Sequence, residues 1–169
     1  MANYRVFIVG LPNSTLMQFM QTSSYFPPIS IEKKNVRDGN IIPMMYGRVS
    51  LGEHMIYMYN PVEYTSLESI QNIWQGLIDE MNGSLLFVNS SDQGMFMEAK
   101  KLLGLLSSKP NAPCIVVATE FNKENSLSLN QIQAALNIDE RHLTACISTQ
   151  TSSVRQALGQ ILDILGGKK

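Results

Sequence analysis

The sequence predicts an α/β domain built on a six-stranded, mostly parallel β-sheet with helices on both faces and one antiparallel strand. Short apolar runs of strand length alternate along the chain with segments in which apolar residues recur every three to four positions, the spacing of a helix face. Strands that alternate with helices in this way form parallel sheets covered on both sides. The length of 169 residues is that of one ordinary domain, so we expect a single domain over residues 1–169.

Turn and cap residues divide the first half of the chain. Asn13 or Ser14 is available as the N-cap of the first helix. Gly52 suits the tight turn of an antiparallel hairpin, and Thr65 with Glu68 has the capping-box spacing that opens the next helix. The expected elements are strand 4–9, a helix from Ser14, a long exposed loop at 23–42 that contains two consecutive prolines, strands 44–51 and 53–59, and a helix from Thr65.

The second half of the chain repeats a strand followed by a helix three times. Ser128 and Gln131 form a second capping box, which predicts the start of a short helix. Gly166 and Gly167 are suited to ending the last helix. The expected elements are strand 84–88, helix 92–106, strand 113–118, a helix from Ser128, strand 143–147 and a helix from Ser153.

Composition and charge exclude several classes of function. The chain has 13 Lys and Arg against 14 Asp and Glu, a balance that favours neither nucleic acid nor an anionic membrane as a partner. No apolar run approaches the ~20 residues that span a bilayer, so we expect a cytoplasmic protein. His54 and His142 have no companions at metal-ligand spacing, which predicts no metal site. Cys114 and Cys146 lie in apolar runs, where cysteines are usually buried.

The loops after the strands are the candidate sites, because ligands of open α/β sheets bind beyond the carboxyl ends of the strands. The first of these loops, from Gly10 to Met17, lacks the second glycine and the lysine of a phosphate-binding loop. Asn13, Ser14 and Thr15 place small polar groups at a helix N-terminus. Such groups either cap the helix or bind an anion, and we favour the cap.

A family resemblance becomes visible in the first half of the chain. It rests on Gly10-x-x-Asn13 after the first strand, on Ile-Pro-Met-Met-Tyr-Gly-Arg-Val at 42–49, and on Trp74 in the following helix. These features resemble bacterial Ras-like small GTPases, and the nearest group is the gliding-motility type. The resemblance covers nearly the whole chain and implies a three-layer P-loop NTPase, or Ras-like, fold.

The motifs of that family are mostly absent. By the resemblance, Leu16 replaces the phosphate-binding lysine, Met17 replaces the Ser or Thr that ligates magnesium, and Ile41 falls near the switch threonine. Residues 59–63 replace the Gly-Thr-Pro-Gly-Gln turn, and Asn122 replaces the guanine-selecting aspartate, so that an amide stands where two acceptors are needed. The vestigial nucleotide pocket is expected at Gly10, Asn13, Ser14, Thr15, Thr119, Asn122 and Ser148.

These departures predict a catalytically inactive Ras-like domain, a pseudo-GTPase that serves as a protein-binding scaffold or regulatory module. Without the lysine and the magnesium ligands, a triphosphate would bring roughly four negative charges into a site with little compensation. We therefore expect no catalytic residue and no cofactor. One alternative is a divergent GTPase that binds GTP or GDP with magnesium weakly, and another is an enzyme that uses the remodelled pocket for a different small ligand.

The hairpin at 44–59 predicts the surface that meets a partner. Its side chains alternate between the two faces of the sheet, and some of its aromatic and apolar residues must therefore point outward. The expected contacts are Met45, Tyr46, Arg48, Tyr57 and Tyr59. The resemblance implies a roadblock-type protein partner, whereas an exposed second strand at the sheet edge favours a homodimer formed by strand addition.

Overall fold

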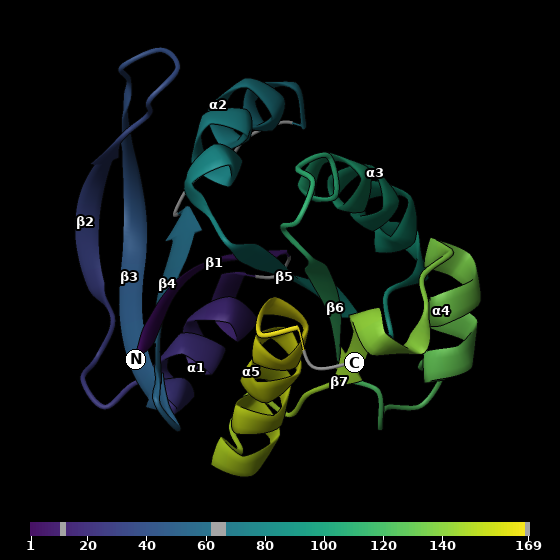
Figure 1. Ribbon diagram of the computed structural model, residues 1–169. Coiled ribbons are helices and arrows are strands. Elements are labelled where there is room, and N and C mark those ends of the chain that lie inside the picture. Colours follow the sequence, from purple (N-terminus) through teal and green to yellow (C-terminus); the bar gives the residue numbers. More distant parts are fainter. Residues whose placement is uncertain (11–12, 62–66, 168–169) are drawn as a thin grey trace.

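The fold has three layers, with a mixed β-sheet between two layers of helices (Figure 1). The computed structural model describes residues 1–10, 13–61 and 67–167. The strands are β1 (Ala2–Gly10), β2 (Ile29–Lys34), β3 (Ile41–Leu51), β4 (His54–Pro61), β5 (Gly83–Asn89), β6 (Cys114–Thr119) and β7 (Leu143–Ala145). The helices are α1 (Asn13–Ser23), α2 (Leu67–Glu80), α3 (Phe96–Leu106), α4 (Leu129–Leu136) and α5 (Thr151–Leu165), with short 3₁₀ turns η1 (Gln93–Met95) and η2 (Glu140–His142).

The order of the strands confirms a mostly parallel sheet with one antiparallel strand. It is β2-β3-β4-β1-β5-β6-β7, and β3 runs antiparallel to both of its neighbours while the other pairs are parallel. The described residues form seven strands instead of the expected six, because β2 lies within the segment 23–42 that was expected to be a loop. Pro27 and Pro28 precede this strand and do not interrupt it, so they are compatible with the ladder.

The extra strand also corrects the expectation that the second predicted strand lies at the edge of the sheet. The strand expected at the edge of the sheet, residues 44–51, belongs to β3, and β3 is paired with β2 on one side and β4 on the other. Its backbone groups are therefore already used by the ladder. The edges of the described sheet are β2 and β7.

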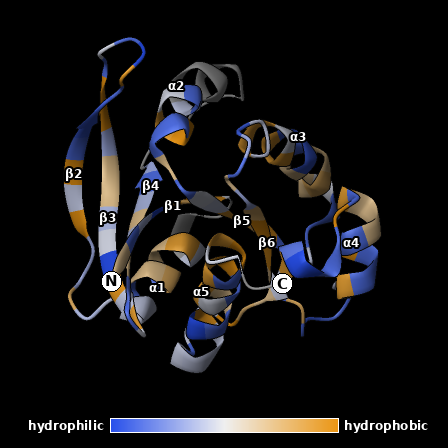
Figure 2. Ribbon diagram, viewed as in Figure 1, coloured by the Kyte–Doolittle hydropathy of each residue, from blue (hydrophilic) through white to orange (hydrophobic). Residues whose placement is uncertain are grey.

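Two hydrophobic cores hold the layers together. On the upper face of the sheet, as seen in Figure 1, Phe7 of β1 packs with Trp74 of α2 and with residues of α3 and α4. On the lower face, Ile8 packs with Phe19 of α1 and Leu158 of α5. Figure 2 shows the hydrophobic residues of β5 and β6 in the centre of the molecule. Both faces are covered because neighbouring residues of β1 point to opposite sides.

The local signals of the second half are largely confirmed. Ser128 Oγ accepts a hydrogen bond from the Gln131 amide at 3.2 Å, and the Gln131 side chain accepts one from the Ser128 amide at 2.8 Å. The helix expected at 92–106 begins as η1 and continues as α3, and the last strand ends at Ala145. The expected capping box at Thr65 lies outside the described residues.

Both cysteines are buried in the protein, and His142 pairs with a carboxylate. Cys114 and Cys146 are buried, and burial raises the pKa of the Cys114 thiol to about 12. His142 Nδ1 lies 2.7 Å from a carboxylate oxygen of Asp139. Within residues 1–10, 13–61 and 67–167, no three His, Cys, Asp or Glu side chains gather as metal ligands would. No helix in these ranges has the length and hydropathy needed to cross a bilayer.

Gly10 is required where β1 meets β5. Its φ of +135° lies in the region that favours glycine, and a Cβ at this position would lie 2.3 Å from the Phe87 carbonyl oxygen. Because the obstacle is backbone, neither strand can move aside without losing part of the ladder. A side chain at Gly10 therefore perturbs the centre of the sheet.

Gly10→Ala is expected to destabilise the protein by at least about 2 kcal/mol, through both backbone strain and steric overlap. Urea unfolding followed by circular dichroism measures the loss. Gly104→Ala is the matched control, since Gly104 lies inside α3 and an added Cβ would meet no neighbouring segment within 4 Å, and it is expected to stabilise by roughly 0.5–1 kcal/mol. Equal stability of Gly10→Ala and the wild type would contradict this role.

Candidate functional site

A small pocket lies at the carboxyl edge of the sheet, where ligands of such folds bind. It has a volume of about 230 Å³ and is lined by the start of α1 and by the loops after β6 and β7. It brings together Thr15, Thr119, Asn122 and Ser148, four of the residues expected there from the sequence. Gly10 ends β1 and is not among the lining residues, and the side chains of Asn13 and Ser14 are outside the described part.

Several polar groups of this pocket already have partners within the protein. The Thr119 hydroxyl donates to the Val88 carbonyl at 3.3 Å, and the Ser148 carbonyl accepts from the Thr22 hydroxyl at 2.6 Å. The Ser126 hydroxyl closes the loop after β6 by donating to the Glu120 carbonyl at 2.6 Å. The exposed amide of Asn122 offers one donor group and one acceptor oxygen to a ligand. The pocket is smaller than the ~300–1,000 Å³ typical of small-molecule sites.

The Leu16 side chain is buried in the core and does not face the pocket. Its side chain is 1% exposed and belongs to the lower core, together with Phe19 and Met20 one helical turn later. The spacing of these residues places them on the face of α1 that covers the sheet. The position that the resemblance assigns to a phosphate-binding lysine is therefore part of the packing between α1 and the sheet.

Asn60 is a buried polar residue that sequence reasoning did not single out. It lies near the end of β4, is 1% exposed, and donates from Nδ2 to the Ile8 carbonyl at 2.7 Å. This bond ties β4 to the centre of the sheet. In the described part of the chain, its Oδ1 has no hydrogen-bond partner. Residues 62 and 63, which complete the 59–63 segment compared above with the Gly-Thr-Pro-Gly-Gln turn, lie outside the described residues.

A second site joins the tip of the β2–β3 hairpin to α2. The Asn35 side chain is buried and accepts a hydrogen bond from the Arg37 amide at 3.0 Å, while the Asn35 carbonyl accepts from the Gly39 amide at 2.9 Å. Asn35 sits directly against Gly76 of α2, because a Cβ on Gly76 would lie 1.8 Å from Asn35 Oδ1. Only a glycine in the helix leaves room for this contact.

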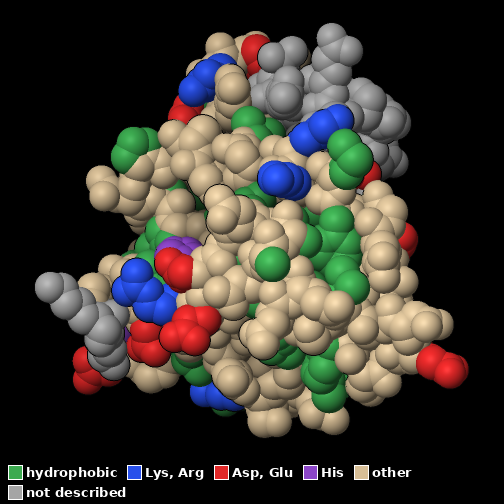
Figure 3. Space-filling model, turned by 90° about the vertical axis from the view of Figure 1, so that its right-hand side faces the viewer, with side chains coloured by type: hydrophobic (Ala, Val, Ile, Leu, Met, Phe, Trp, Pro, Cys, Tyr) green, Lys and Arg blue, Asp and Glu red, His purple; other side chains and the backbone are tan. Residues whose placement is uncertain are grey.

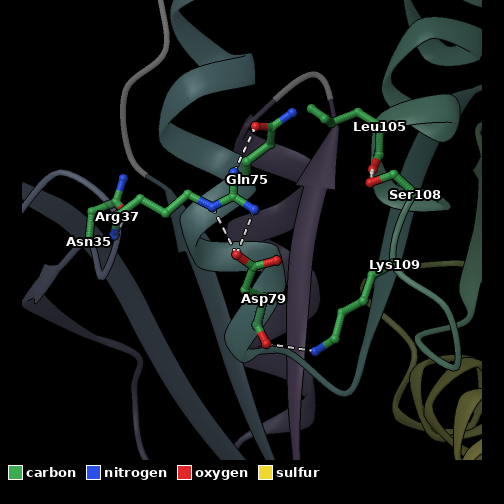
Figure 4. Close-up of polar contacts among 7 residues, drawn as sticks. All are labelled: Asn35, Arg37, Gln75, Asp79, Leu105, Ser108 and Lys109. Carbon is green, nitrogen blue, oxygen red and sulfur yellow. Dashed lines mark hydrogen bonds and ion pairs between the residues drawn. The ribbon is translucent and has the colours of Figure 1, made fainter.

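Arg37 strengthens the same contact with charge. Its Nε donates to Asp79 Oδ2 at 2.9 Å, its Nη2 lies 2.8 Å from the same oxygen, and its Nη1 donates to Gln75 Oε1 at 3.1 Å (Figure 4). Nearby, Lys33 of β2 forms an ion pair with Glu80 at the end of α2. The guanidinium fork thus contacts two successive turns of one helix.

Lys109 holds α2 from the opposite side. Its ammonium donates to the Asp79 carbonyl at 2.7 Å (Figure 4) and to the Met81 carbonyl at 2.7 Å. A cation at this end of a helix satisfies carbonyls that have no partner in the helix and opposes the helix dipole. We call the set Asn35, Arg37, Gly76, Asp79 and Lys109 the α2 latch. Sequence reasoning missed it because its members are far apart in the chain, although a glycine inside a helix is itself a sign of close backbone approach.

The residues expected on the partner surface divide between two faces. Tyr46, Arg48, Tyr57 and Tyr59 share the upper face, with the Tyr46 and Tyr59 rings 5.3 Å apart and the Tyr46 and Tyr57 rings 6.3 Å apart. Met45 points to the lower face, where it packs against the core beneath the sheet. The alternation of strand side chains separates neighbours in this way.

The side of the molecule formed by α3 and α4 is of mixed character. Figure 3 shows acidic and basic side chains close to a histidine there, with hydrophobic side chains in small groups among polar ones. His142 and Arg141 both lie near Asp139 in this region. Charges of opposite sign compensate one another on this side, which carries no strong field.

The order of strands, the two helical layers and the pocket at the carboxyl edge define a small-GTPase-like P-loop NTPase fold. The G domain of the T. maritima FeoB iron transporter is similar, with a TM-score of 0.70, 14% identity, and coverage of 96% of this chain and 98% of that one. The cytosolic domain of the same transporter in a GDP form has a TM-score of 0.68 and 12% identity, and the match covers 99% of this chain and 65% of that one. No protein-family model and no curated protein matches the sequence.

Gly76→Ala is expected to push Asn35 out of its place and to destabilise the protein by about 1–2 kcal/mol, because a buried hydrogen-bonded side chain loses its partner. Hydrogen exchange of residues 35–40 is expected to rise while the strands stay protected. Gly159→Ala in α5, where an added Cβ would meet no side chain or neighbouring segment within 4 Å, is the control and leaves the hairpin unchanged. Unaltered exchange in Gly76→Ala would contradict the latch.

Proposed function

We propose that this chain is a catalytically silent Ras-like domain, a pseudo-GTPase of the cytoplasm, that acts as a scaffold or regulatory module for a protein partner. The observation that carries the proposal is Leu16. A phosphate-binding loop needs a cation whose ammonium reaches the β and γ phosphates, and here the equivalent position supplies an apolar side chain that is 1% exposed. Converting it to a binding residue would require α1 to be repacked.

The residues present do not fit a magnesium nucleotide. Met17 follows Leu16 and offers a thioether, a soft ligand that magnesium does not favour. Thr119 has its hydroxyl committed to the Val88 carbonyl. We therefore derive no catalytic step for this chain, and the role left for the domain is binding.

The α2 latch supports a scaffold role. In a GTPase that switches between two states, the helix that corresponds to α2 must be free to move. In this chain the second half of α2 is held by Arg37 from the hairpin and by Lys109 from the loop before β6. A helix with contacts on both sides presents one surface, which suits a constant partner.

A divergent GTPase with weak affinity is the second candidate, and the pocket at the carboxyl edge is the observation that favours it. Thr15, Asn122 and Ser148 still surround about 230 Å³ at the place expected for a base. The same pocket is also the place where an enzyme acting on another small ligand would bind it. The proposal also includes a relationship to the gliding-motility group and a roadblock-type partner, and only the sequence resemblance supports these two points.

A thermal shift titration with GTP, GDP and ATP, each with and without magnesium, tests the proposal. Binding with a dissociation constant one hundredth of the ligand concentration stabilises by about 2.7 kcal/mol, which is roughly 5–10 °C for a domain of this size. We expect no shift at millimolar nucleotide. A magnesium-dependent shift specific for guanine would contradict the silent domain and establish the second candidate. Asn122→Asp is the sensitised control, because it restores the carboxylate that selects guanine.

A further inference from the structure

An open groove on the upper face of the sheet lies beside the end of α2. It has a volume of about 500 Å³, more than twice that of the pocket at the carboxyl edge. Strands β1, β3 and β4 form its floor, and the last residue of α2 and the turn that follows form its wall. We call it the tyrosine groove, and it is lined by Asn3, Arg5, Tyr46, Tyr57, Tyr59, Glu80 and Asn82.

One row of side chains across the floor is apolar and aromatic. Ile29 of β2 is directly opposite Tyr46 of β3, and Tyr46 is directly opposite Tyr59 of β4, so all three side chains point to the same face. Ile29 is 56% exposed, and the exposed rings of Tyr25 and Phe26 precede it in the chain. Exposed apolar side chains that adjoin one another mark surfaces that bind partners.

The next row is basic. Arg48 of β3 and Arg5 of β1 both face Tyr57 of β4, one on each side. Both arginines are exposed, and neither takes part in an ion pair with any residue of the described ranges. Two strand spacings separate their backbones by roughly 10 Å. Among the described residues, the row therefore offers two cations without an ion-pair partner, with an aromatic ring between them.

The remaining charges around the groove are already paired. Glu80 is bound by Lys33, whose ammonium lies 5.9 Å from the centre of the Tyr59 ring. Burial raises the pKa of both Tyr46 and Tyr59, so these phenols are neutral at physiological pH and can donate hydrogen bonds. The groove as a whole presents positive charge and donors, which are complementary to carboxylates.

We propose that the tyrosine groove binds an acidic, amphipathic segment of a partner protein. Carboxylates of that segment pair with Arg5 and Arg48, and its apolar side chains cover Ile29 and the tyrosines. An extended segment laid along the two rows directs alternate side chains to each row, because its side chains alternate with a period of two. Arginine and tyrosine, together with tryptophan, are enriched at the energetic centres of protein interfaces. This inference rests on the proposed function, in which the domain works by binding a protein.

The probe is a capped nonapeptide of alternating glutamate and leucine, titrated into the nucleotide-free protein labelled with ¹⁵N. We expect saturable shifts at the backbone amides of Arg5, Tyr46, Tyr57 and Asn82, and an affinity that falls as salt is raised. The variant carrying both Arg5→Ala and Arg48→Ala is expected to bind at least about tenfold more weakly, since two charge pairs are lost. Arg155→Ala, which removes an exposed arginine of α5 on the other face, is the matched control.

Besides a failure of the peptide to bind, three outcomes would overturn the inference. They are shifts confined to other surfaces, an equal loss of affinity in Arg155→Ala, and binding of inorganic phosphate at the same residues as tightly as the peptide, which would mark a small-anion site. A lysine and leucine peptide of the same length is expected not to bind. Circular dichroism melts confirm that the arginine variants are folded. If the peptide does not bind and nucleotides cause no thermal shift, this inference alone is overturned. If a guanine nucleotide causes a thermal shift, the proposed catalytically silent function is overturned, and the peptide result stands independently.

Discussion

The burial of β1 between two helical layers is the constraint on which the rest of the structure depends. Residues Val6 to Val9 are inaccessible to solvent on both faces, with Phe7 directed to the upper core and Ile8 to the lower one. Gly10 then allows the strand to end against the backbone of β5. The point at which β1 ends fixes the position of the carboxyl edge of the sheet, where the small pocket lies. It also leaves the polar beginning of β1, with Arg5, as the floor of the tyrosine groove.

The two sites differ in how much of their chemistry is still available. At the carboxyl edge, Leu16 is absorbed by the core and the Thr119 hydroxyl by the sheet, so few polar groups face a ligand. In the tyrosine groove, Arg5 and Arg48 are exposed, and no ion pair with another described residue compensates their charge. The α2 latch lies next to this groove and holds its wall in place. This contrast supports the proposal that the chain binds a protein at a constant surface.

The alternation of strands and helices could be predicted from the sequence because burial imposes a clear period on each element. Strand β2 could not be predicted, because two prolines precede it and half of its residues are charged. These residues obscured the alternation of buried and exposed side chains. The capping box at Ser128 is local and was visible, whereas the contact between Asn35 and Gly76 depends on packing between segments far apart in the chain. Met45 was grouped with Tyr46 by proximity in the chain, although strand geometry places them on opposite faces.

The proposed function requires that the surface next to α2 does not respond to nucleotide. Hydrogen exchange of residues 35–40 and 74–81, measured with and without millimolar GTP and magnesium, tests it most directly, because exchange reports the local opening of the latch. Identical protection in the two conditions is the predicted result. A guanine-dependent loss or gain of protection in both segments would contradict it, since it would mean that the hairpin and α2 still work as a switch.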